Sequence, residues 1–290
     1  MENNLKEIKE EKQLINWYPG HMAKAIKEIK ENATLADIFI IVLDARCPIS
    51  SYNEDFDSIA PQKPRIFIIT KSDLMDSDKK SMIQKRFGNE KLLWLDLRNP
   101  KSKNQILSEI KKISKTKQQR DREKGLINSR IKVFVMGIPN AGKSTLINLM
   151  SGKKSLKVAN YPGVTRDKKW VAVDNIFFMD TPGILLPKLN DQEAAAKLAM
   201  IGSIETKIFP QKFLFNCFID VIAKYYPERL LEEFNLNSDD IDSLDDIKKY
   251  NMLYKIADNK GFKQNNKPDF NKVYTYFINW AKNLKNVTFD

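Results

Sequence analysis

Gly137-Ile138-Pro139-Asn140-Ala141-Gly142-Lys143-Ser144 follows the pattern G-x-x-x-x-G-K-[ST] and comes directly after the apolar, β-branched run Ile131–Met136. A helical run then extends over Ser144–Met150. A phosphate-binding loop needs this order of strand, loop and helix. The two glycines let backbone N–H groups wrap the phosphates, and the helix N-terminus adds a positive field. The sequence therefore predicts a P-loop domain rather than an ordinary glycine-rich turn.

Each side chain of this loop has an expected task. Lys143 would reach the β- and γ-phosphates and assist catalysis, and the Ser144 hydroxyl would hold Mg²⁺. The rest of the phosphate cradle is predicted to be Asn140, Ala141, Gly142 and Thr145.

Two further motifs follow the loop. Asp180-Thr181-Pro182-Gly183 comes after the apolar strand Ile176–Met179, so the Asp180 carboxylate could hold Mg²⁺ and the Gly183 N–H could meet the γ-phosphate. Thr165 lies between the two motifs and is the candidate switch threonine, which would bind Mg²⁺ and act in catalysis. The alternatives are an ordinary turn and a polar loop threonine.

The base-reading signature [NT]-K-x-D occurs twice. Asn266–Asp269 (NKPD) follows a polar stretch that cannot be a central strand, whereas Thr70–Asp73 (TKSD) follows the apolar run Arg65–Ile69. Ligands bind at the carboxyl ends of strands in open α/β sheets. We therefore predict that Asp73 reads guanine, with Thr70, Lys71 and Ser72 beside it, and that the motifs run in a circularly permuted order, base loop before P-loop.

The remaining pattern predicts the architecture. Short apolar runs alternate with helical stretches, which favours a three-layer α/β domain with a mostly parallel sheet over residues 1–195. A basic linker is expected at about 115–130. A small all-helical domain is expected at 196–290, because no convincing strand follows Ala195. The predicted strands are Ile38–Leu43, Arg65–Thr70, Leu92–Asp96, Ile131–Met136, Lys169–Val173 and Ile176–Met179. The predicted helices are Ala23–Ala36, Asp76–Phe87, Asn104–Ser114, Ser144–Met150, Phe213–Tyr226 and Val273–Leu284.

Charge and cysteine content narrow the class of protein. The net charge of +12 favours nucleic acid or another anionic partner, although abundant Lys can also serve solubility alone. Residues 101–132 hold eleven Lys and Arg against three acidic residues, whereas residues 191–290 hold fourteen against fifteen. Two isolated cysteines match no zinc pattern and indicate a reducing compartment. With no secretory signal and no apolar run of the ~20 residues that cross a bilayer, we expect a cytoplasmic protein without a membrane partner.

Several of these segments resemble the circularly permuted ribosome biogenesis GTPase A (RbgA/YlqF) family. They are Asn16–Ala25 (NWYPGHMAKA), Leu43–Pro48 (LDARCP), TKSD, the P-loop, PGVTRD, DTPGIL and, loosely, the final Val287–Asp290. The resemblance implies a GTPase that acts late in assembly of the large ribosomal subunit, binds GTP or GDP with Mg²⁺, and is stimulated by the subunit. It also implies that the helical domain touches rRNA.

The resemblance implies further site residues. It gives His21, the one histidine, a catalytic role, and it lets Asn140 help to hold K⁺. Asp96 and Leu97 align with a second base loop that usually reads Asn-Ser or Ser-Ala, and Thr70 replaces the usual Asn. Many GTPases carry a catalytic Gln where this chain has Ile184, which cannot orient water by hydrogen bonding.

Some alternatives remain open at this stage. His21 could merely pack in its turn, and Asn140 could simply form the loop. The whole chain could also be a P-loop ATPase, or an RNA-binding nucleotide switch with little hydrolysis.

Overall fold

The computed structural model describes residues 14–15, 20–126, 129–152, 170–185 and 191–290; for His21 it describes the backbone only. The described chain forms two compact units. One holds residues 20–185, and the other holds residues 191–289 together with Leu14 and Ile15. The division comes slightly before the boundary expected at residue 195, so all of helix α6 (Gln192–Met200) belongs to the second unit.

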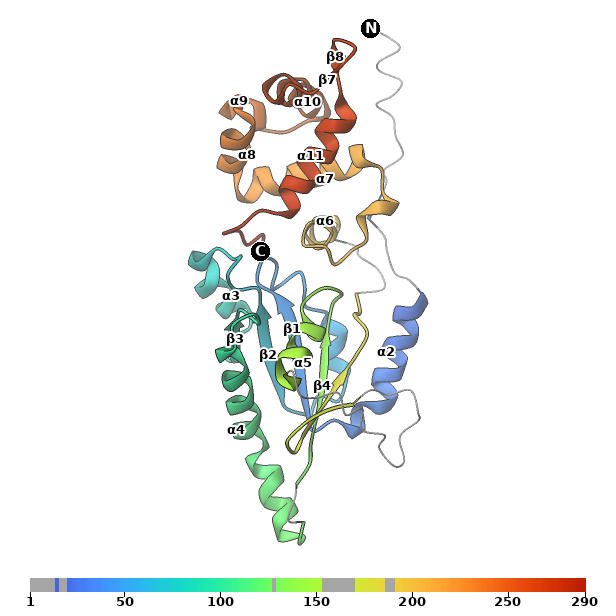
Figure 1. The fold of residues 1–290 in the computed structure, drawn as a ribbon, viewed down its shortest axis with the longest axis vertical. Helices are drawn as coiled ribbons and strands as arrows, with labels where there is room; N and C mark the ends of the chain where they lie inside the picture. The colour runs from blue at the N-terminus through green and yellow to red at the C-terminus, as the bar shows by residue number, and fades with distance from the viewer. Residues whose placement is uncertain (1–13, 16–19, 127–128, 153–169, 186–190) are drawn as a thin grey trace. The chain divides into compact units, whose positions relative to one another are not determined.

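The first unit is built on a six-stranded sheet in the order β3-β2-β1-β4-β6-β5 (Figure 1). All neighbours pair in parallel except β5, which runs antiparallel to β6. The mostly parallel sheet predicted from the sequence is confirmed. Its strands are β1 (Ile38–Asp44), β2 (Arg65–Thr70), β3 (Leu92–Leu95), β4 (Ile131–Gly137), β5 (Trp170–Val173) and β6 (Ile176–Asp180).

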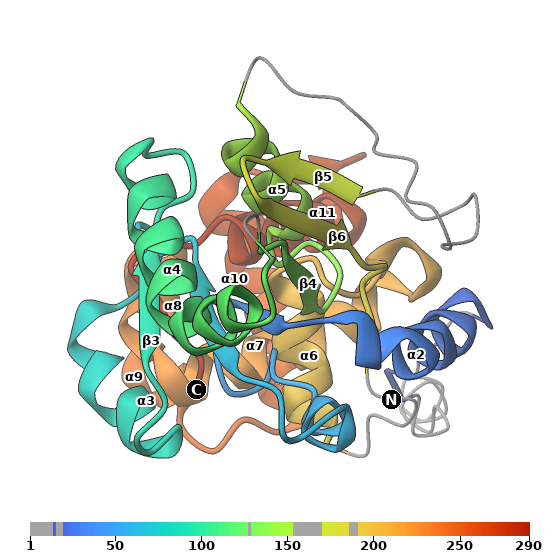
Figure 2. The same ribbon diagram turned by 90° about the horizontal axis from the view of Figure 1, so that it is seen from below.

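Helices cover both faces of this sheet, so the layers are three. All seven residues of β1 are buried, as a strand with two covered faces requires. Helix α2 (Gly20–Asn32) and helix α3 (Lys80–Arg86) contribute Ala25, Ile29 and Ile83 to one core cluster. Helix α4 (Lys101–Glu123) and helix α5 (Lys143–Ser151) lie on the opposite side of the sheet from α2 (Figure 2). Short 3₁₀ turns connect the elements: η1 (Ala33–Leu35), η2 (Glu54–Ser58) and η3 (Ser77–Lys79).

Helix α4 differs from the sequence prediction. Residues 115–123 were expected to begin a linker, but they continue the helix to Glu123. They lack apolar periodicity, yet Lys, Gln, Arg and Glu are good helix formers, and extending an existing helix requires no new nucleus. Lys117 stabilises this extension through a 2.9 Å contact with Asp121 and a hydrogen bond to the Arg130 carbonyl.

The second unit is helical, as predicted, with one small addition. Its helices are α6, α7 (Gln211–Tyr225), α8 (Pro227–Phe234), α9 (Ser238–Ile241), α10 (Asp246–Lys260) and α11 (Phe270–Lys282), with a 3₁₀ turn η4 (Thr206–Ile208). Aromatic rings join α7, α8 and α11; the centroids of Phe215 and Phe277 are 4.6 Å apart. The expectation of an all-helical domain is wrong in one place, because β7 (Lys263–Gln264) and β8 (Lys267–Pro268) form a hairpin.

That hairpin accounts for the second [NT]-K-x-D sequence. Asn265 and Asn266 both have positive φ, as a tight turn between two strands requires. Asp269 then caps helix α11 by accepting a hydrogen bond from the Lys272 N–H. The motif is therefore a turn and a helix cap in the helical unit, which agrees with choosing Thr70–Asp73 as the base loop. In the described part of the chain, no helix is long and apolar enough to cross a membrane.

Candidate functional site

The carboxyl ends of five parallel strands bring the predicted motifs to one edge of the sheet. Asp44 of β1 pairs with Thr70 of β2, and Val42 pairs with Gly137 of β4. Asp180 ends the neighbouring strand β6. Since ligands bind outside the carboxyl ends of parallel strands, this edge is the candidate site.

The P-loop glycines are required by geometry. Gly137 has φ +152°, and a Cβ there would lie 2.4 Å from the Val42 carbonyl oxygen. Gly142 has φ +106° and precedes helix α5. Asn140 also adopts a positive φ of 58°, which Asn tolerates better than most residues. Ala141 is fully buried beneath the loop.

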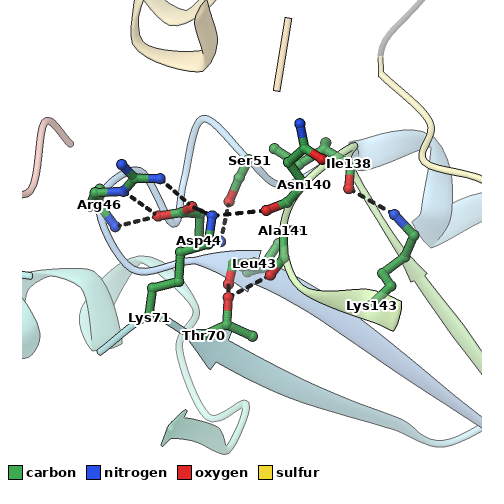
Figure 3. Close-up of polar contacts among 10 residues, drawn as sticks. All are labelled: Leu43, Asp44, Arg46, Ser51, Thr70, Lys71, Ile138, Asn140, Ala141 and Lys143. Carbon is green, nitrogen blue, oxygen red and sulfur yellow. Dashed lines mark hydrogen bonds and ion pairs between the residues drawn. The ribbon is translucent and has the colours of Figure 1, made fainter. Parts of the chain in front are cut away.

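Lys143 lies at the start of α5 with its side chain buried. Its Nζ donates a 2.8 Å hydrogen bond to the Ile138 carbonyl, so the loop curls around its own lysine (Figure 3). Burial lowers the pKa of Lys143 to about 8, although the nearby Asp180 carboxylate opposes this shift. An anionic ligand beside Lys143 would therefore stabilise its charged ammonium form.

Nucleotide binding is expected to take up a proton at Lys143. At pH 8 about half of the free molecules carry a neutral Lys143, and phosphate groups favour the charged form, so binding takes up about half a proton. Affinity should then fall as pH rises above about 8. Calorimetric titration with GDP at pH 8, in two buffers of different ionisation enthalpy, measures this uptake. The Lys143→Arg variant keeps its charge over this pH range, so its nucleotide binding should take up no proton. Equal proton uptake in the variant and the wild type would show that Lys143 is not the group that takes up the proton.

Two of the predicted magnesium ligands, Ser144 and Asp180, lie next to each other in the structure. The Ser144 hydroxyl, exposed at the second position of α5, donates a 3.0 Å hydrogen bond to the Asp180 carboxylate. Thr145 is exposed next to it. The third candidate, Thr165, lies outside the described residues.

The DTPG segment packs directly against the P-loop. A Cβ on Gly183 would lie 2.6 Å from the Pro139 nitrogen, so only glycine fits here. The Ile184 N–H donates to the Gly137 carbonyl at 3.2 Å. The Ile184 side chain is completely buried in the core, so the residue after DTPG does not face the site.

A cavity of about 570 Å³ lies between these segments. Helix α2, the P-loop and DTPG line it, and it is reached by Ala25, Glu28, Asn140, Lys143, Asp180 and Gly183. The backbone of His21 lies in the first turn of α2, but its side chain is outside the described part of the structure.

Hydrogen bonds join the predicted base loop to the P-loop (Figure 3). The Thr70 hydroxyl lies 2.5 Å from the Ala141 carbonyl and 3.0 Å from the Leu43 carbonyl. Thr70 therefore keeps a P-loop contact despite replacing Asn. The Lys71 ammonium donates to the Asn140 carbonyl at 2.8 Å and to the Asp44 carboxylate at 2.6 Å. The Ser72 N–H lies 3.4 Å from the Leu95 carbonyl at the end of β3.

The segment proposed as a second base loop lies beside the predicted first one. Asp96 and Leu97 follow β3, and a Cβ on Gly142 would meet Leu97 at 3.5 Å, so this segment reaches the P-loop. Arg98 links the two loops through a 2.6 Å contact with Asp73 and a 3.0 Å contact with Asp96. Its side-chain hydrogen bond lowers the pKa of Asp96.

Sequence reasoning missed two members of this arrangement. Asp44 was noted only as part of a resembling segment, and Arg98 was not considered. A charged residue at the end of an otherwise apolar strand was the available signal for Asp44, since such ends line the site.

Several known proteins are similar to this chain. A family model described as a 50S ribosome-binding GTPase matches residues 132–260. Ribosome biogenesis GTPase A of Priestia megaterium (strain DSM 319 / IMG 1521) is 38% identical over 227 residues, which cover 77% of this chain and 79% of that protein. A probable ribosome biogenesis GTPase A of Mycoplasma genitalium (strain ATCC 33530 / DSM 19775 / NCTC 10195 / G37) is 30% identical over 93% of this chain and 94% of its own.

Among solved structures, GNP-bound YlqF from T. maritima has the same fold. The TM-score is 0.60 at 22% identity, over 92% of this chain and 97% of that one. The sequence relationship, which spans more than three quarters of both chains, shows that this chain is a GTP hydrolase belonging to the ribosome biogenesis GTPase A family.

Proposed function

We propose that this GTPase acts in late assembly of the large ribosomal subunit, in the cytoplasm, and that the subunit stimulates its hydrolysis of GTP. One observation supports stimulation by the ribosomal subunit. Ile184 is completely buried where a water-orienting Gln often stands, so the attacking water needs a group from elsewhere. The relatives' name, ribosome biogenesis GTPase A, supports the ribosome as the partner that completes the site.

His21 is the proposed catalytic group within the chain. Helix α2 lines the cavity through Ala25 and Glu28. Positions four and seven residues apart share a helix face, so the backbone of residue 21 lies on this same face. Imidazole can accept a proton from water near neutral pH.

Ser144 and Asp180 fit Mg²⁺, with Thr165 proposed as a third ligand. Their oxygen atoms lie 3.0 Å apart at the cavity, and a hard divalent cation prefers oxygen ligands. When bound, the ion would neutralise charge on the β- and γ-phosphates. We also propose Asn140, on the lining of the same cavity, as a K⁺ contact.

RNA contacts are proposed for two surfaces, one on each unit. Helix α4 carries exposed basic residues along its length, including Lys111, Lys112, Lys115, Arg120 and Arg122. In the helical unit, predicted as residues 196–290, a groove of about 540 Å³ is lined by Arg229, Trp280 and Lys285 with three asparagines. Positive charge suits phosphates, and an aromatic face suits an unpaired base. This groove provides a local site in a unit whose net charge is close to zero.

Hydrolysis of GTP and of ATP, measured in K⁺ buffer with and without purified large ribosomal subunits, tests the proposal. We expect GTP to be the only substrate and the subunit to raise the rate. His21→Ala should reduce the stimulated rate by roughly 10²-fold or more, as loss of a general base or water-positioning group does.

Small ribosomal subunits at the same concentration serve as the control for nonspecific binding. Equal stimulation by both subunits would argue against the proposed partner. Stimulation that survives His21→Ala would keep the partner and remove His21 from catalysis.

A further inference from the structure

Asp44 is the most deeply buried charged group at the candidate site. Its side chain is 1% exposed and follows six apolar residues of β1. The Arg46 guanidinium contacts both carboxylate oxygens, at 3.0 Å through Nε and 2.9 Å through Nη2, and the Arg46 N–H adds a third hydrogen bond. Burial by itself would raise the pKa of Asp44, but Arg46 and Lys71 outweigh it and hold that pKa below its ordinary value. The carboxylate is therefore charged.

The second cation on this carboxylate comes from the base loop. Lys71 Nζ lies 2.6 Å from Asp44 Oδ2 and 2.8 Å from the Asn140 carbonyl (Figure 3). One ammonium group therefore joins the end of β1, the base loop and the P-loop. Arg46 contacts both oxygens of Asp44, and Lys71 adds a second positive charge on one of them.

The backbone of Lys71 indicates what this contact achieves. Its φ is +56°, in the left-handed region, which costs a non-glycine residue roughly 1 kcal/mol or more. Such a conformation persists only when its surroundings hold it. The left-handed turn at Lys71 sets the direction of the next two residues, and Asp73 is the second of them.

We propose that Asp44 is a positioning residue for guanine-nucleotide binding, because it fixes Lys71 and through it the backbone that carries Asp73, whose carboxylate Arg98 also contacts. This inference rests on the proposed assignment of Thr70–Asp73 as the base loop. Asp44 itself contacts no reacting group in this picture. Its loss should therefore weaken nucleotide binding and leave the chemical step unchanged.

Asp44→Asn keeps the size of the side chain and removes its charge. We expect the KM for GTP and the Kd for GDP to rise about tenfold, the effect of losing one charge-assisted hydrogen bond. The kcat at saturating GTP should stay within about twofold of the wild type, since no catalytic contact changes. Mere destabilisation would instead lower the active fraction, and with it the apparent kcat, without changing KM.

A double-mutant cycle with Lys71→Met asks whether Asp44 acts through Lys71. On the Lys71→Met background, Asp44→Asn should change the GDP affinity by less than about twofold. An equal tenfold loss on both backgrounds would overturn the proposal, as would an unchanged KM in Asp44→Asn alone.

Arg46 supplies the matched control and a second route. Arg46→Met leaves the Asp44–Lys71 contact in place and should keep the GDP affinity within about twofold of wild type. If Asp44→Asn leaves Arg46 buried without its partner and fails to fold, Asp44→Asn/Arg46→Met removes both charges of that pair together. This double variant should then bind GDP about tenfold more weakly than the wild type. A GDP affinity equal to that of the wild type would overturn the proposal.

The failure of this inference differs from failure of the site assignment. If Lys71→Met and Asp73→Asn both bind GDP like the wild type, the base loop is elsewhere and the inference falls with it. If they lose affinity while the variants lacking Asp44 do not, only the role of Asp44 is refuted.

Discussion

Asp73→Asn is expected to reverse the base preference of this GTPase from guanine to xanthine. A carboxylate accepts hydrogen bonds from the N1–H and the exocyclic amine of guanine, whereas an amide can donate to the oxygen that xanthine carries instead. In the variant, the amide oxygen can still accept from the N1–H of guanine, but without a charge, and the amide NH2 faces the exocyclic amine, so two donors meet. Each charge-assisted hydrogen bond contributes about 1.5–3 kcal/mol, so losing one and weakening the other should weaken GDP binding by roughly a hundredfold. Competition between GDP and xanthosine diphosphate measures the reversal.

Asp269→Asn is the matched control for this switch. It makes the same change in the other copy of the motif, where Asp269 caps helix α11. Asn and Asp cap helices about equally well, so both stability and base preference should hold. A switch in Asp269→Asn, or none in Asp73→Asn, would contradict the choice of base loop.

Lys143→Met is expected to slow hydrolysis strongly and yet leave the free protein as stable as the wild type, or more so. The lysine is buried, and burial has already lowered its pKa to about 8, so its charge is costly without a ligand. Met has a similar length and carries no charge to bury, which offsets the loss of the hydrogen bond to the Ile138 carbonyl. Losing the charge on the phosphates should reduce kcat/KM by about 10²–10³-fold.

Thermal unfolding with and without GDP separates the two effects of Lys143→Met. The variant should match or exceed the wild-type Tm in buffer and gain little when GDP is added, because binding no longer stabilises the folded state. A large drop of Tm in buffer would mean that Lys143 is mainly structural. Leu146→Met, on the buried side of the same helix, is the control for a change of core side chain.

The central strands and the P-loop were predictable because the signal was local. Runs such as Ile38–Leu43 and Ile66–Ile69 contain only residues that suit a strand buried on both faces, and the structure places strands there. The prediction of the base loop also used local sequence, because one candidate follows such a run and the other follows polar residues.

The features that sequence reasoning missed depend on specific contacts and backbone angles that the pattern of apolar residues does not show. The outer part of α4 is held by Lys117 contacting Asp121 and the Arg130 carbonyl, and no periodicity announces these contacts. The hairpin at Asn265 and Asn266 depends on positive φ values that short polar runs do not reveal. The link from Asp44 to Lys71 joins residues 27 positions apart, which only the pairing of β1 with β2 brings together.

The strand order also dictates when this protein becomes able to bind its ligand during synthesis. The chain completes β1, β2 and β3, and with them the base loop, before any residue of the P-loop strand β4 has been made. Until then β1 presents an open hydrogen-bonding edge, which is exposed to mispairing. Pairing of β1 with β4 joins the part of the sheet that carries the predicted base loop to the part that carries the P-loop. Guanine nucleotide can contact both halves only after β1 and β4 have paired. Its binding therefore stabilises the completed sheet and does not guide the earlier steps of folding.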